Sequence, residues 1–140
     1  MMKDSTLKQC KDWMSVKETI LLVEDEDTIR FMVRMFLKTN GYNVIEAGSG
    51  SEAVAIWETN KSKIDLVVTD LYMPGGIMGL QLAQRLQIDR PNLKVIFTSG
   101  HDCEENAFLD SATNFLPKPY RLNSLAEIVR QSLDTDVQAA

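Results

Sequence analysis

Residues that could do chemistry stand at the ends of four apolar segments. The acidic pair Glu24 and Asp25 closes the first, and Asp70 closes the third. Thr98 closes the fourth, and Lys118 follows the fifth. Singly these residues mean little, because acidic residues after a strand are often helix caps and a lone lysine is usually surface charge. Their order along the chain is what indicates a site.

Three carboxylates in one cleft repel one another, so either their pKa values rise or a cation neutralises them. Oxygen ligands without histidine or cysteine suit a hard ion such as Mg²⁺. Lys118 adds a positive charge for an anion held beside the metal, and the Thr98 hydroxyl can donate to the same anion. A metal, a lysine and a hydroxyl around Asp70 would support phosphoryl transfer onto that carboxylate.

The segments that must bring these residues together alternate between short apolar runs and stretches of helical period, as in βα units around a parallel sheet. In such sheets ligands bind beyond the carboxyl ends of the strands. We therefore expect one α/β domain, a doubly wound (βα)₅ fold with strand order 2-1-3-4-5 and the second and fifth strands near the edges. Strands are expected at Thr19–Glu24, Asn43–Glu46, Leu66–Thr69, Lys94–Thr98 and Asn114–Leu116.

Five helices should connect and cover these strands. They are expected at Asp27–Thr39, from Ser49 through Trp57, at Met78–Ile88, at Glu104–Asp110 and at Leu122–Leu133. The core-facing stripe of the first helix is expected to contain Ile29, Met32, Val33, Phe36 and Leu37. Ser49 and Glu52 have capping-box spacing. The overlapping Gly48–Ala53 also matches a dinucleotide fingerprint, but it follows the second strand rather than the first, so we prefer the capping reading.

Length and composition favour one globular domain at residues 19–134, with a C-terminal tail at 135–140. Residues 1–18 form an N-terminal extension that is either flexible or a short helix. The net charge of -5 argues against nucleic-acid binding. The apolar runs are too short to span a membrane and no secretory signal is evident, so we expect a cytoplasmic protein.

Taken together, the strand-end motifs resemble the receiver domains of two-component response regulators, the fold of the chemotaxis regulator CheY. The similarity covers about residues 18–133. It rests on Leu22-Val23-Glu24-Asp25-Glu26, Thr69-Asp70-Leu71-Tyr72-Met73-Pro74, Phe97-Thr98-Ser99 and Phe115-Leu116-Pro117-Lys118-Pro119. The resemblance implies a flavodoxin-like fold and a role in a phosphorelay.

By this resemblance, Asp70 is the phosphoacceptor. Asp25 and Asp70 are expected to bind Mg²⁺ with the backbone carbonyl of Tyr72, and Glu24 to act on the metal through water. Glu24 stands where Asp is commoner in the family, and its longer side chain alters the reach to the metal.

The resemblance also implies how the signal spreads. Lys118 should pair with Asp70 at rest and with the phosphoryl group afterwards, and the Lys118–Pro119 peptide should be cis. Thr98 and Phe115 match the family's switch pair. Their rearrangement would change the surface of the fourth helix, fifth strand and fifth helix, which is also the face expected for a possible homodimer.

The implied partner is a histidine kinase or a histidine phosphotransfer protein. Phe31, Arg34 and Met35 on the first helix could form a docking patch for it, although Phe31 and Met35 could equally be a half-buried flank. The protein's own chemistry would be limited to accepting the phosphoryl group and hydrolysing it slowly, so we do not expect an enzyme.

Two rivals stay open. One is a receiver-like binding module that does not accept phosphate. The other is a Mg²⁺-dependent phosphohydrolase with an aspartate nucleophile, but that class has a second acid two residues on, where this chain has Tyr72. The sequence also fits both a stand-alone receiver and part of a longer kinase.

Overall fold

The computed structural model describes residues 17–74, 76–100 and 115–139 of the chain. Five parallel strands form one sheet in the order β2-β1-β3-β4-β5, as predicted. The strands are β1 (Thr19–Val23), β2 (Asn43–Ala47), β3 (Leu66–Asp70), β4 (Lys94–Ser99) and β5 (Phe115–Pro117). The central strands β1, β3 and β4 are almost wholly buried, and β2 and β5 lie at the edges.

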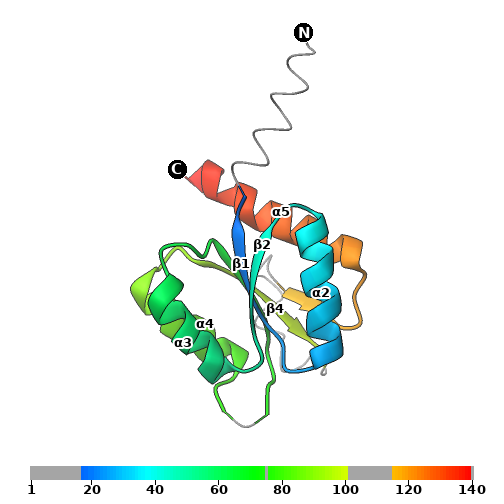
Figure 1. Ribbon diagram of the computed structural model, residues 1–140. Helices are drawn as coiled ribbons and strands as arrows, with labels where there is room; N and C mark the ends of the chain where they lie inside the picture. Colours follow the sequence, from blue (N-terminus) through cyan, green and yellow to red (C-terminus); the bar gives the residue numbers. More distant parts are fainter. Residues whose placement is uncertain (1–16, 75, 101–114, 140) are drawn as a thin grey trace.

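Helices cover both faces of the sheet (Figure 1). They are α2 (Asp27–Thr39), α3 (Gly50–Asn60), α4 (Gly79–Asp89) and α5 (Leu122–Ala139). Figure 1 shows α2 and α5 on one face and α3 and α4 on the other. The predicted helix Glu104–Asp110 and residues 1–16 of the predicted extension lie outside the described residues. Among the helices that are described, none is long and apolar enough to cross a membrane.

Alternation along the strands divides the core into two layers. Ile20 and Leu22 of β1 pack in the layer under α2 and α5, whereas Leu21 and Val23 pack in the layer under α3 and α4. Apolar side chains from the middle of the strands fill both layers, and polar side chains stand at the carboxyl ends of the strands.

Local signals mark the end of α2 and the start of α3. Gly41 has a φ of 97°, a conformation that L side chains rarely adopt, and it follows the end of α2. The Ser49 hydroxyl caps α3 by accepting the Glu52 N–H at 3.1 Å. The capping box is modified, because the Glu52 carboxylate accepts from the Gly48 N–H at 2.8 Å rather than from Ser49. α5 runs past the predicted Leu133 to Ala139, since no glycine or proline interrupts it there.

One core prediction is wrong. Met32 was expected on the buried stripe of α2 but is 50% exposed, while Val33 and Leu37 are buried as predicted. The reason is tertiary: Met32 lies at an apolar cavity of about 470 Å³ between α2 and the start of α5, with Tyr120 and Leu122 on the other wall.

Candidate functional site

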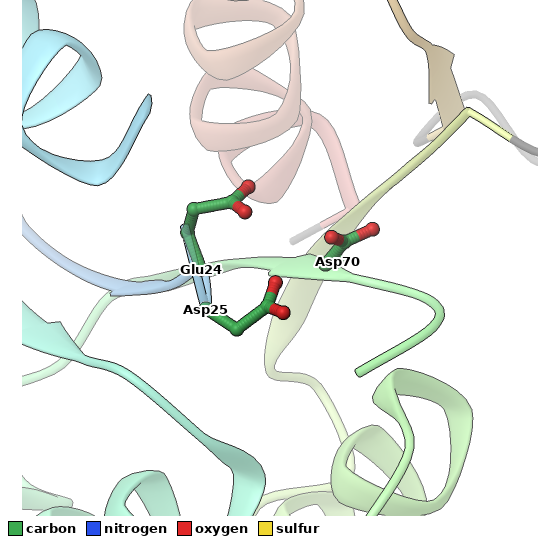
Figure 2. A group of neighbouring side chains, drawn as sticks. All are labelled: Glu24, Asp25 and Asp70. Carbon is green, nitrogen blue, oxygen red and sulfur yellow. The ribbon is translucent and has the colours of Figure 1, made fainter. Parts of the chain in front are cut away.

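Three carboxylates meet at the carboxyl edge of the sheet. Glu24 and Asp25 follow β1, and Asp70 ends the neighbouring strand β3. One oxygen of each lies within 4.8 Å of the others. Figure 2 shows the Asp25 and Asp70 side chains reaching toward a common space, with Glu24 beside them. Glu24 and Asp70 are only 3% and 8% exposed, whereas Asp25 is more accessible. The structure thus brings together the three acids that the sequence singled out.

Lys118 joins this cluster from the segment after β5. Its Nζ lies 3.0 Å from Glu24 Oε1 and 3.1 Å from Asp70 Oδ2, so it donates to both acids. The Lys118 N–H donates to the Ser99 carbonyl at 2.7 Å, which ties the lysine backbone to the end of β4. The Lys118–Pro119 peptide is cis. The resting ion pair therefore includes Glu24 as well as Asp70.

Burial dominates the electrostatics of the two inner acids. It raises the pKa of Glu24 and of Asp70, although Lys118 acts in the opposite direction on both. Burial alone would lower the pKa of Lys118, but its hydrogen bonds and charge interactions with Glu24 and Asp70 outweigh this and raise it. Lys118 therefore stays charged at neutral pH.

The donor set fits a hard divalent cation. Three carboxylates face one ammonium group, so the cluster has an excess of negative charge when its acids are ionised. All the candidate ligand atoms are oxygens, the ligands that Mg²⁺ prefers. Burial raises the pKa of Glu24 and of Asp70. A bound cation would favour the ionised form of both carboxyl groups and so offset this effect.

The two predicted switch residues occupy different positions relative to Asp70. Thr98 is buried and lies directly beside Asp70 in the register of β3 and β4, and its carbonyl accepts the Leu71 N–H at 2.8 Å. Phe115 is half-buried, pairs with Phe97 and packs against the layer under α3 and α4. The structure thus places Thr98 at the site, and the coupling of Phe115 to it stays a prediction.

The backbone of Asp70 is enclosed by the start of α4. The Thr69 hydroxyl donates to the Asp70 carbonyl at 3.0 Å. A Cβ on Gly79 would overlap that carbonyl oxygen and lie 2.9 Å from the Leu71 Cα. This support was not predicted from the sequence, in which its one signal is a glycine near the start of the helical period.

The segment that carries Tyr72 is held in a similar way. The Tyr72 backbone hydrogen-bonds to the Asp70 carboxylate, which lowers the pKa of that carboxyl against the larger effect of burial. Further along, a Cβ on Gly50 would lie 2.6 Å from the Ile77 carbonyl oxygen. Close packing and the Ser49 cap therefore account for the glycine-rich sequence before α3 without a nucleotide. The role of the Tyr72 carbonyl toward a metal stays a prediction.

The predicted docking residues lie on α2. Phe31 and Met35 are 54% and 45% exposed, so about half of each residue's surface is open to solvent, and their docking role stays a prediction. The Arg34 guanidinium lies 5.3 Å from the centroid of the Phe31 ring. Arg34 Nε lies 3.0 Å from Glu46 Oε2, an ion pair without hydrogen-bond geometry. We call Phe31, Arg34 and Met35 the α2 patch.

Comparison with known proteins gives concordant results. The family model described as "Response regulator receiver domain" matches residues 20–130. The sensor kinase CckA of Brucella abortus is 39% identical over 137 residues, which are 94% of this chain and 14% of that protein. The chain therefore spans only a small part of that relative.

Solved structures agree in fold. The receiver domain of the hybrid histidine kinase CckA has a TM-score of 0.69 and 39% identity, covering 82% of this chain and 98% of that one. A response regulator receiver domain protein from Clostridium thermocellum has a TM-score of 0.79 and 27% identity, covering 88% and 99%. Both are similar to this chain along nearly their whole length.

Proposed function

The chain belongs to the response regulator receiver domain family, and on that premise we propose that Asp70 accepts a phosphoryl group in a two-component phosphorelay. The observation that carries the proposal is the shared environment of Asp70. Its carboxylate lies within 4.8 Å of Glu24 and Asp25 oxygens and 3.1 Å from Lys118 Nζ. A nucleophile among metal-ligand oxygens, with an ammonium group at its side, suits phosphoryl transfer.

Glu24, Asp25 and Asp70 would hold Mg²⁺ together with the backbone carbonyl of Tyr72. The bound ion would supply positive charge for the non-bridging oxygens of the incoming phosphoryl group. Glu24 already gives one oxygen to Lys118 and the other to the Glu26 N–H, at 3.0 and 3.1 Å. This leaves Asp25, the more accessible acid, as the ligand with most freedom to meet a cation.

In the transfer, a carboxylate oxygen of Asp70 forms a bond to phosphorus as the donor's bond to phosphorus breaks. The donor imidazole, or acetate from acetyl phosphate, leaves with that electron pair, and the product is an aspartyl phosphate. Lys118 and Thr98 stabilise the charge on the phosphoryl oxygens. Water later attacks the phosphorus of the aspartyl phosphate, the bond from Asp70 to phosphorus breaks, and inorganic phosphate leaves. We expect this reaction to be slow.

The output would be a change in surface. Thr98 would turn toward the phosphoryl group and Phe115 would follow, altering the face made by the fourth predicted helix, β5 and α5. That face is also where a homodimer would form. The burial of Thr98 beside Asp70 and the half-buried packing of Phe115 support this step.

The phosphodonor would be a histidine kinase or a histidine phosphotransfer protein that docks on the α2 patch. Two exposed apolar side chains and a guanidinium on the same helix support this assignment. The neighbouring exposed Met32 and the apolar cavity beside it extend the surface toward Lys118. Met32 and Lys118 both line this cavity, so it connects α2 with the reactive edge of the sheet.

The test is incubation with Mg²⁺ and acetyl phosphate, followed by intact-mass measurement of the wild type and of Asp70→Asn. We expect one phosphoryl group on the wild type, none on Asp70→Asn, and none on the wild type in EDTA. Absence of labelling on the wild type would favour a binding module. Rapid turnover of many phosphomonoesters would favour a phosphohydrolase.

A further inference from the structure

Arg30 makes three well-defined contacts that the proposed reaction has not used. Its Nη1 donates to the backbone carbonyl of Glu24 at 2.7 Å. Its Nη2 donates to Asp27 Oδ1 at 2.7 Å, and its Nε to Glu46 Oε1 at 3.2 Å. The side chain is 21% exposed, so the guanidinium lies largely against the protein.

Arg30 contacts Glu24 just after the point where β1 stops pairing with β2. The Glu24 N–H donates to the Ala47 carbonyl at 3.1 Å, just past the last paired residues of β1 and β2. The Glu24 carbonyl begins the peptide that leads to Asp25. Arg30 is the donor that the structure gives to this carbonyl, so it constrains the orientation of the Glu24–Asp25 peptide.

The guanidinium is itself held from two other elements. Glu46 belongs to β2 and Asp27 to the first turn of α2, so Arg30 joins a strand and a helix to the loop between β1 and α2. A Cβ on Gly48 would lie 3.3 Å from Arg30 Nη1, so the backbone after β2 approaches the guanidinium closely. The planar fork of arginine suits simultaneous bonds to one carbonyl and two carboxylates.

We propose that Arg30 is a positioning residue for the metal-binding acids: it fixes the Glu24–Asp25 peptide and thereby orients Asp25 toward the cation. Glu24 has its own restraints in Lys118 and the Glu26 N–H, whereas the more accessible Asp25 depends on the direction of its backbone. This inference rests on the proposed function, because it assumes a Mg²⁺ site at these acids. Groups that orient metal ligands commonly change metal affinity by tenfold or more when removed.

A purely electrostatic role and a purely structural role of Arg30 each predict a different change in Mg²⁺ affinity. Arg30 is a cation close to a site for another cation, so simple repulsion would make its removal strengthen Mg²⁺ binding. If Arg30 only stabilises α2 through ion pairs, its removal would lower thermal stability and leave Mg²⁺ affinity unchanged. Only loss of orientation weakens binding, which makes the sign of the change decisive.

The experiment is titration of the phosphate-free protein with MgCl₂ by isothermal calorimetry. The variants are Arg30→Met, which keeps the aliphatic stem, and Arg30→Lys, which can restore one hydrogen bond. Arg85→Met on α4 is the matched control, since it removes the same charge from an exposed pair with Glu58. We expect Mg²⁺ to bind about tenfold more weakly to Arg30→Met than to the wild type. The affinity of Arg30→Lys should lie between these two, and that of the control should equal the wild-type value.

Circular dichroism melts of each variant in EDTA separate folding from binding. If Arg30→Met does not fold, Arg30→Lys carries the test, since it keeps a donor and a charge. Affinity at or above the wild-type value in a folded Arg30 variant overturns the positioning role. If the wild type itself binds no Mg²⁺, the proposed function fails, which is a different result from unchanged affinity in the variant.

Discussion

At the scale of single residues, the site holds charge that the folded chain does not fully compensate. Asp70 is 8% exposed, and burial raises its pKa despite the ammonium of Lys118. Lys118 is shared with Glu24, so neither acid has a cation to itself. Buried groups of this kind commonly occur at functional sites, where a ligand supplies what the fold lacks.

Neutralising Asp70 should therefore stabilise the metal-free protein. We expect Asp70→Asn to raise the free energy of unfolding in EDTA at neutral pH, because the variant no longer buries a carboxylate charge. The folded-state pKa lies above the ordinary value of 3.8, so ionisation costs stability in the wild type. That cost is absent below the unfolded-state pKa and complete above the folded-state pKa. The gain should accordingly grow as pH rises through this interval and then level off.

Thermal melts in EDTA from acid to neutral pH measure this effect. Glu127→Gln, on the exposed face of α5, changes the net charge equally without touching the cluster and should leave the melting temperature unchanged. With saturating Mg²⁺ the order should reverse, because binding stabilises the wild type more than Asp70→Asn. A less stable Asp70→Asn in EDTA would mean that the ion pair with Lys118 outweighs the burial of the acid.

At the scale of elements, the first turn of α4 packs against the backbone of Asp70. The Gly79 N–H donates to the Leu71 carbonyl at 2.9 Å, and its missing side chain allows the first turn of α4 to lie against the Asp70 carbonyl. α3 approaches the same loop through Gly50 and the Ile77 carbonyl. Helix starts thus set the position of the reactive strand end.

Gly79→Ala should destabilise the protein although alanine is the better helix former. The added Cβ has backbone atoms rather than a flexible side chain in its way. We expect a loss of about 2 kcal/mol from overpacking, measured by urea denaturation, together with slower labelling by acetyl phosphate. Gly76→Ala is the control, because its Cβ would meet only Ser51 Oγ at 3.8 Å. A Gly79→Ala protein as stable as the wild type would show that α4 can shift without cost.

At the scale of the whole molecule, the sheet separates two layers of helices (Figure 1). The two layers carry different side chains on their outer surfaces. The layer with α2 and α5 presents the α2 patch, Met32 and the apolar cavity near Lys118. The layer with α3 and α4 presents an exposed Ile88 on α4 and an inter-helix hydrogen bond from Trp57 to Asp89 at 2.8 Å. A donor that must reach Asp70 should therefore approach over α2.

Replacing both Phe31 and Met35 by serine should slow transfer from a protein donor by about tenfold, the equivalent of 1.4 kcal/mol of docking energy. Labelling by acetyl phosphate should stay at the wild-type rate, because the patch lies outside the acidic cluster. The donor is the one that labels the wild type fastest among phosphorylated kinases and phosphotransfer proteins from the source organism.

Ile88→Ser is the matched control, since Ile88 is 74% exposed and belongs to α4, which covers the opposite face of the sheet (Figure 1). Its transfer rate should equal that of the wild type. Equal losses from the protein donor and from acetyl phosphate in the Phe31 and Met35 variant would remove the docking role and point to damage at the site.

The sequence by itself determined the strands, the order of the sheet and the edge that carries Asp25, Asp70, Thr98 and Lys118. The spacing of apolar residues along the chain predicts strands and helices, and the topology of parallel sheets predicts which strand ends share an edge. Both can be applied without coordinates. The tertiary structure decided the exposure of Met32, the sharing of Lys118 between Glu24 and Asp70, the contact of Gly79 with Asp70 and the bond from Arg30 to the Glu24 carbonyl. Each of these depends on distances of a few ångströms between side chains and backbone in the packed chain, and periodicity carries no information about such distances.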